Sequence, residues 1–295
     1  MPLFPVNSGF SRLDRILAKQ VEIMFEGLNR QSASDAFPRI ETLASLLSSL
    51  ADNSATTRTV AVSRQVLTSF ATAAVEMWLR AIHSFLISAS LTEASPIWAS
   101  VSGYYASHYA IRGFAHLLGV FQLHKIKKIV YLQITAQPFV CSIEKKSGWN
   151  REHKFYWKYV SEHPSFSGDP FFYPNREDLS KSDGSHRNKA NYADHVNRFP
   201  VFEPLESEYI RQRVERISNI EFSDVPIPSA DRFPDIDSVQ IVAYHRIVKF
   251  RRCVDEVLGE KNRFWRVHRK PSWCPDTMTF SLVDPAYLKL YASRS

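Results

Sequence analysis

The sequence is poor in cysteine, which forms disulfides and thiolate metal sites, and in glycine, which forms phosphate-binding loops. It has three cysteines, Cys141, Cys253 and Cys274, and no two of them form a CxxC pair. A disulfide scaffold and a thiolate zinc site are therefore not expected, and this cysteine usage suits a reducing compartment. With 9 glycines and 16 prolines among 295 residues, the chain is neither collagen-like nor of low complexity.

Several catalytic motifs are also absent from the sequence. It contains no GxxxxGK[ST], no GxGxxG and no GxSxG, which argues against a P-loop nucleotidase, a dinucleotide enzyme and an α/β-hydrolase. Its ten histidines include no HxxxH pair. We therefore expect no metal site and no cofactor.

The sequence shows no targeting or membrane-spanning signal. Its first fifteen residues lack a basic region followed by an apolar core, so no signal peptide is expected. Residues 73–91 are strongly apolar but include Glu76, Arg80 and His83, each costly in hydrocarbon. We expect a buried helix there, in a cytoplasmic protein with no membrane partner.

Hydrophobic periodicity predicts a mainly α-helical fold. Apolar residues recur at helical spacing over residues 11–31, from about Pro38 to 51, over 57–91, and from Pro96 to about 119. Four helices joined by short loops indicate a bundle. Residues 128–135 and 138–144 are short β-branched runs, which predict a two-stranded β insertion near 128–144.

The second half of the chain is predicted to extend this bundle. Helical patterns cover residues 150–161, 185–197, 205–218 and 236–258. We assign residues 1–223 to the bundle and 224–235, with three prolines, to a linker. Residues 236–295 are predicted to form a basic helix and an irregular tail from 262 onward, packing on the bundle.

Two polar stripes carry the candidate chemistry. Tyr104, His108, Arg112 and His116 fall at steps of four, so a helix places them on one face. A second stripe is formed by Arg187, Asn191 and His195, also at steps of four, and Asn188 and Tyr192 lie beside it. In isolation, each stripe is more typical of a polar seam or an exposed helix face than of an active site.

Together the stripes resemble the HEPN superfamily (higher eukaryotes and prokaryotes nucleotide-binding domain). Small prokaryotic members carry a helix of the form YYxxxYAxR, matched here by Tyr104, Tyr105, Tyr109, Ala110 and Arg112 in register. A later helix in such members has an Arg and then Asn or Asp before Tyr, matched by Arg187 and the pair Asn191-Tyr192. The resemblance covers roughly residues 95–197.

The resemblance implies a bundle of about four helices, often dimeric, in toxin–antitoxin, abortive-infection or CRISPR-linked antiviral defence systems. Active members are ribonucleases that need no metal, in which an Arg holds the phosphate and a His, separated from it by four to six intervening residues, exchanges protons. The implied catalytic residues here are Arg187, Asn188, Tyr192 and His195, with His108, Arg112 and His116 opposite.

The chain departs from the family pattern at the catalytic histidine. Tyr192 stands where an active member could have His, and seven residues separate Arg187 from His195. Arg112 and His116 have only three residues between them, although a composite site that pairs Arg187 with His108 or His116 remains open. A phenol, with an ordinary pKa near 10, is a poor proton shuttle at neutral pH.

Two functions follow from the resemblance, and a third alternative is structural. The first is a defence or toxin–antitoxin protein that binds RNA or another nucleic acid and cleaves RNA. The alternative is a non-catalytic scaffold or interaction subunit of a multi-protein complex. Either would act as a homodimer or with a partner protein encoded nearby. In the structural alternative, the arginines and tyrosines form a buried network that specifies packing.

Positive charge is concentrated in residues 246–270. The chain has a formal net charge of +7, and this stretch holds nine Lys and Arg against three acids. Cations mixed with aromatic rings suit a phosphate backbone with stacked bases, whereas packing of the rings on the core is an equal alternative. The predicted nucleic-acid-binding residues are Arg246, Lys249, Arg251, Arg252, Arg263, Trp265, Arg266, Arg269 and Lys270. A smaller group, Lys125, Lys127, Lys128, Lys145 and Lys146, could extend this surface.

Overall fold

The computed structural model describes residues 15–30, 40–51, 58–134, 138–145, 152–166, 169, 172, 207–220 and 236–269. These residues are mainly helical and include one small antiparallel sheet, which confirms the predicted fold class at this level. The helices are α1 (Arg15–Glu26), 3-10 helix η1 (Gly27–Arg30), α2 (Ile40–Leu50), α3 (Arg64–Ser90), α4 (Pro96–Leu117), α5 (Glu152–Glu162), α7 (Ser207–Ser218), α8 (Ile236–Leu258) and α9 (Arg263–His268).

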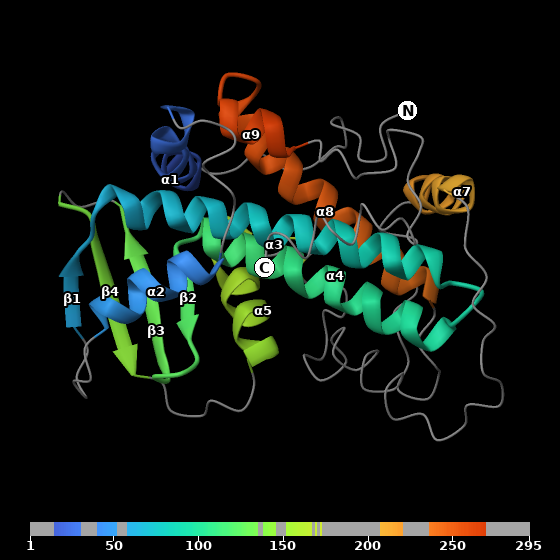
Figure 1. The fold of residues 1–295 in the computed structure, drawn as a ribbon, viewed down its shortest axis with the longest axis horizontal. Helices are drawn as coiled ribbons and strands as arrows, with labels where there is room; N and C mark the ends of the chain where they lie inside the picture. Colours follow the sequence, from blue (N-terminus) through green and yellow to red (C-terminus); the bar gives the residue numbers. More distant parts are fainter. Residues whose placement is uncertain are drawn as a thin grey trace.

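A long antiparallel hairpin of α3 and α4 forms the centre of the molecule (Figure 1). Pro96 opens α4 at its first position, as predicted, although the Ser95 side chain makes no capping bond. Gly113 allows close packing of α4, because a Cβ atom there would lie 3.0 Å from Phe250 Cε2 and 3.2 Å from the carbonyl oxygen of Ala74. Three helices therefore meet at this glycine.

Helix α8 packs across the hairpin and joins it to the end of the chain. Trp78 of α3 donates its indole N–H to the carbonyl of Ile247 at 3.0 Å and stacks on Phe250, with ring centroids 5.9 Å apart. Trp265 of α9 lies 5.2 Å from the Trp78 ring. Aromatic packing thus fixes α8 and α9 on the helical core.

The sheet is larger than the predicted two-stranded insertion. Its strands are β1 (Arg58–Ala61), β2 (Val120–Leu123), β3 (Lys128–Gln133) and β4 (Val140–Lys145), all antiparallel in the order β1-β4-β3-β2. The two predicted strands correspond to β3 and β4. β1 lies where the helix over residues 57–91 was predicted to begin, so that part of the prediction is wrong.

Non-local pairing explains why β1 and β2 escaped the sequence analysis. A strand of four residues is too short to show two-residue periodicity, and β1 exists because Arg58 to Ala61 pair with distant β4. β2 begins after Gly119, whose left-handed φ of 76° turns the chain out of α4. A Cβ atom on residue 119 would lie only 2.7 Å from the Cβ of Leu132 on β3, so this position has no room for a side chain.

Three further predictions concern the second half of the chain, and two of them fall on residues that the structure does not describe. The predicted helix over 185–197 and the linker over 224–235 lie outside the described residues. The expectation of an irregular tail from residue 262 is wrong for 263–268, which form α9. There Asn262 caps the helix, its Oδ1 accepting from the backbone N–H of Trp265 at 3.0 Å.

Within the described residues, one helix is long and apolar enough to cross a membrane by length and composition. It is α3, and 78% of its most apolar 18-residue window is buried inside the protein. Helices α1, α2, α4 and α8 pack against it, as expected for the core helix of a globular protein.

Candidate functional site

The polar stripe of α4 faces the interior of the protein. Tyr104 and His108 stack with their ring planes 5° apart, and both side chains are buried. Arg112 is half-buried, and its guanidinium lies 5.3 Å from the centre of the Tyr156 ring of α5. The stripe therefore packs toward α5.

His116, the last member of the stripe, is held as a neutral ring. Its Nδ1 lies 2.9 Å from the carbonyl oxygen of Val120, so this nitrogen donates its proton at the start of β2. Burial, with the charge of Arg112 as a smaller cause, lowers the pKa of His116 to about 3. The imidazole is fully buried and uncharged at neutral pH, so it carries no acidic proton for a substrate.

Two cations of α8 also point inward. The Arg246 guanidinium lies 4.1 Å from the Trp157 ring centre and donates to the Ser107 hydroxyl. The Lys249 ammonium pairs with Asp169 and lies 5.6 Å from the Phe172 ring centre. Arg246 and Lys249 are 0% and 1% exposed, so neither belongs to the outer surface.

The structure thus brings together residues that the sequence analysis had placed in separate sites. Arg112, predicted as catalytic, and Arg246 and Lys249, predicted to bind nucleic acid, lie where α4, α8 and α5 meet. We call these three side chains and their aromatic partners the cation–ring cluster. Each cation rests against a ring, a contact worth up to about 2 kcal/mol when desolvated. Because Arg246 and Lys249 are almost completely buried, the cluster fits the alternative in which these polar residues form a network that specifies packing.

A second buried network surrounds Asp255 of α8. Its carboxylate accepts from the Trp265 indole N–H at 2.6 Å and from Arg269 Nη1 at 3.2 Å, and it lies 3.5 Å from Arg251 Nε. The Asp255 side chain is only 8% exposed. Trp265 and Arg269, both predicted to contact nucleic acid, are therefore occupied in fixing α9 to α8, and Arg251, also predicted to do so, lies beside the same carboxylate within α8.

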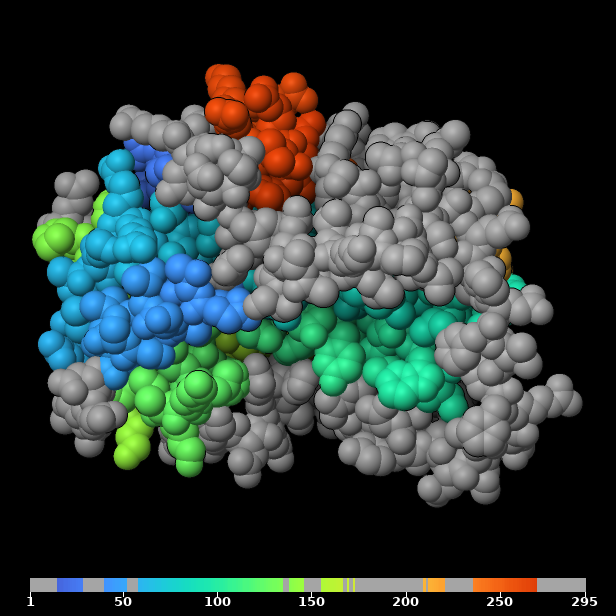
Figure 2. All heavy atoms as spheres, in the orientation of Figure 1, coloured from blue at the N-terminus to red at the C-terminus, as the bar shows by residue number. Residues whose placement is uncertain are grey.

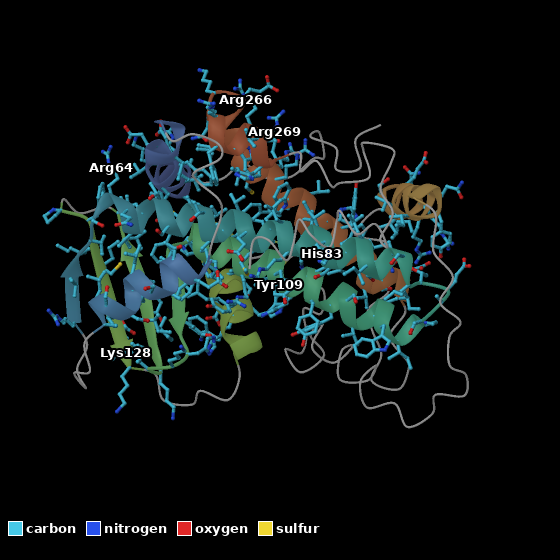
Figure 3. All side chains as sticks on the ribbon, viewed as in Figure 1. Arg64, His83, Tyr109, Lys128, Arg266 and Arg269 are labelled. Carbon is cyan, nitrogen blue, oxygen red and sulfur yellow. The ribbon has the colours of Figure 1, made fainter. Side chains whose placement is uncertain are left out.

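Two of the remaining predicted cations of this region, Arg263 and Arg266, are exposed on α9, and a third, Arg252, is half-buried. Lys261, which was not among the predicted binding residues, is exposed just before α9. We call Lys261, Arg263 and Arg266 the α9 surface. Figure 2 shows α9 projecting from the top of the molecule, and Figure 3 places Arg266 at its tip.

The other predicted catalytic residues lie outside the described residues. They are Arg187, Asn188, Tyr192 and His195, and Lys270 of the basic stretch lies outside as well. Among the described residues, no group of three or more His, Cys, Asp and Glu side chains could hold a metal ion.

A further titratable cluster on α3 has a structural role. Glu76 accepts from Arg80 Nε at 2.9 Å and from the backbone N–H of Ile40, the first residue of α2. Burial raises the pKa of Glu76. The carboxylate satisfies a free N–H at the start of α2 and so attaches this helix to α3.

The sequence analysis did not identify the aromatic and acidic side chains that contact the buried cations. Tyr156 and Trp157 lie in a run that was noted only as aromatic, and Asp255 was counted only as a charge. The signal for burial was present in α8, where apolar residues occupy every face of the helix around Arg246 and Lys249. A helix that is apolar all round is a buried helix, and its cations are then inside.

The chain was also compared with known proteins. No protein-family model, curated protein or solved structure matched it.

Proposed function

We propose that this chain is a HEPN-like, RNA-binding subunit of a prokaryotic defence or toxin–antitoxin module. It acts in the cytoplasm by binding, as a homodimer or with a partner protein encoded nearby. The family assignment rests on the resemblance carried by Tyr104 to Arg112 and by Arg187 to Tyr192. The proposal of binding rests on the distribution of charge described below.

The observation that carries the proposal is the α9 surface. Asp255 and the aromatic rings hold the inner cations of residues 246–269, whereas Lys261, Arg263 and Arg266 remain exposed. Exposed cations on a projecting helix suit the phosphate backbone of a nucleic acid.

Binding is favoured over cleavage by the state of the histidines. His116 is neutral and fully buried, and His108 is 2% exposed and stacked on Tyr104. A general acid or base must reach the reacting hydroxyl within hydrogen-bond distance. At the position of the family histidine in the second stripe stands Tyr192.

The test is binding to a fluorescently labelled single-stranded RNA, measured by anisotropy as a function of salt. Wild-type protein should bind with an affinity that falls steeply with salt. In Arg263→Gln/Arg266→Gln the slope of log K against log salt should fall by about 1.4, or about 0.7 for each lost phosphate contact. A control, Lys19→Gln/Lys158→Gln, removes two charges from exposed ion pairs on α1 and α5. Failure of the wild type to bind RNA would refute the proposal.

Ribonuclease activity is the second candidate, and the half-buried guanidinium of Arg112 beside His108 favours it. It is tested by incubating the protein with structured RNA without added metal, alongside Arg187→Ala and His195→Ala. We expect no cleavage. Cleavage that is lost in folded Arg187→Ala would establish the catalytic alternative instead.

A further inference from the structure

A second group of cations lies at one end of the sheet. Its exposed members are Arg58 on β1, Lys145 on β4, and Lys125 and Lys127 in the turn between β2 and β3, and its fifth member, Lys128 at the start of β3, is only 7% exposed. We call these five residues the sheet-end cluster. The described strands and their connecting turns carry one carboxylate, Glu144, against these five cations.

The strand register places like charges opposite each other. Lys128 pairs directly with Lys145 across β3 and β4, so both side chains stand on the same face of the sheet. Arg58 pairs with Ile143, two residues before Lys145 on β4, and therefore lies on this face as well.

The turn adds two further lysines in a fixed conformation. Lys125 and Lys127 are exposed, and the backbone N–H of Lys127 donates to the carbonyl of His124 at 3.3 Å. Lys127 has a left-handed φ of 52°, a conformation in which glycine or asparagine is usual. The lysine costs about 1 kcal/mol there relative to glycine.

The α9 surface and the sheet-end cluster are two separate sets of cations. Next to the α9 surface, Asp169 pairs with Lys249, and Asp255 and Glu260 pair with Arg269. At the sheet end, Lys125, Lys127 and Lys145 are exposed. Figure 3 shows Lys128 at the lower end of the sheet and Arg266 and Arg269 at the opposite side of the molecule, so the two surfaces are separate.

We infer that the sheet-end cluster binds the phosphate backbone of RNA, as a second contact in addition to the α9 surface. This inference rests on the proposed function for the nature of the ligand. A lipid surface fits less well, because membrane-bound cationic segments also expose apolar anchors. The exposed large apolar side chains of the described residues are Ile16, Trp98 and Val267, and all three lie on helices rather than in the sheet. In Figure 2 atoms of the sheet lie at the lower left of the molecule.

The inference is tested in the same anisotropy assay with the triple variant Lys125→Gln/Lys127→Gln/Lys145→Gln. Loss of three phosphate contacts should lower the salt slope by about 2 and weaken binding on the order of tenfold or more at 0.1 M salt. The variant Lys125→Arg/Lys127→Arg/Lys145→Arg keeps the charges and should restore binding. The control Lys19→Gln/Lys158→Gln/Arg216→Gln lowers the net charge equally at exposed ion pairs elsewhere and should bind like wild type.

The outcomes separate this inference from the proposed function. If the triple variant binds RNA with the wild-type slope while Arg263→Gln/Arg266→Gln is weakened, the sheet-end inference is overturned and RNA binding stands. If wild type binds no RNA, both fail. If wild type and the triple variant differ only on vesicles of anionic lipid, the ligand is a membrane surface and the RNA inference is overturned.

Discussion

The carboxylate of Asp255 is the side chain whose loss should destabilise the protein most clearly. Asp255→Ala removes the acceptor of the Trp265 indole N–H, a hydrogen bond to a charged group worth about 1.5–3 kcal/mol. It also removes the carboxylate beside Arg251 and Arg269, whose side chains are 3% and 12% exposed. Breaking a buried ion pair from one side costs about 3–5 kcal/mol, and we expect a total loss in this range.

The assay for Asp255→Ala is urea unfolding followed by circular dichroism, analysed for the free energy of unfolding. A loss of 3–5 kcal/mol is a large part of the roughly 5–15 kcal/mol that stabilises a typical protein. The neighbouring residue provides the control, since Glu256 is exposed on the same helix and Glu256→Gln should change the free energy by less than about 0.5 kcal/mol. A loss below about 1 kcal/mol in Asp255→Ala would refute the view that this carboxylate fixes α9 to α8.

Two further predictions concern stability. The pKa of His116 is about 3 in the folded protein and about 6.5 when unfolded, so the unfolded state takes up the proton first. The free energy of unfolding should therefore fall by up to about 1.4 kcal/mol for each pH unit below 6.5 on account of this residue. The free energy of unfolding, measured with urea, should differ between pH 7.5 and 5.5 by about 1 kcal/mol less in His116→Gln than in wild type. His124→Gln is the control at an exposed histidine. If the pH difference in His116→Gln equals that of wild type, the assignment of a buried neutral His116 is contradicted. Gly113→Ala should lose about 1–2 kcal/mol despite the better helix propensity of alanine, because its Cβ meets Phe250 and the Ala74 carbonyl. Equal or higher stability of that variant would show that the three helices are packed less closely.

Much of the helical structure could be predicted from local sequence. Periodic apolar residues and Pro96 located α4, and the long pattern over 236–258 corresponds closely to α8. Each of these signals is local, since a helix hydrogen-bonds within its own segment. The β-branched runs that became β3 and β4 were found for a similar reason, because their composition is itself distinctive.

The sheet as a whole could not be predicted in this way. β1 is four residues long and is held by β4, far along the chain. The register of β3 with β4 places Lys128 opposite Lys145, and the pairing of β1 with β4 brings Arg58 to the sheet-end cluster. Strand pairing depends on partners that local sequence does not specify.

The sequence alone determined which residues carry charge and that most of the described residues are helical. Only the tertiary structure decided where those charges lie. Arg246 and Lys249 were predicted at a surface, but the packing of α4 and α5 against α8 supplies Ser107, Trp157 and the other partners that hold them inside. A cation can be buried only where rings and acceptors from other segments compensate for lost hydration, and their positions are set by the fold as a whole.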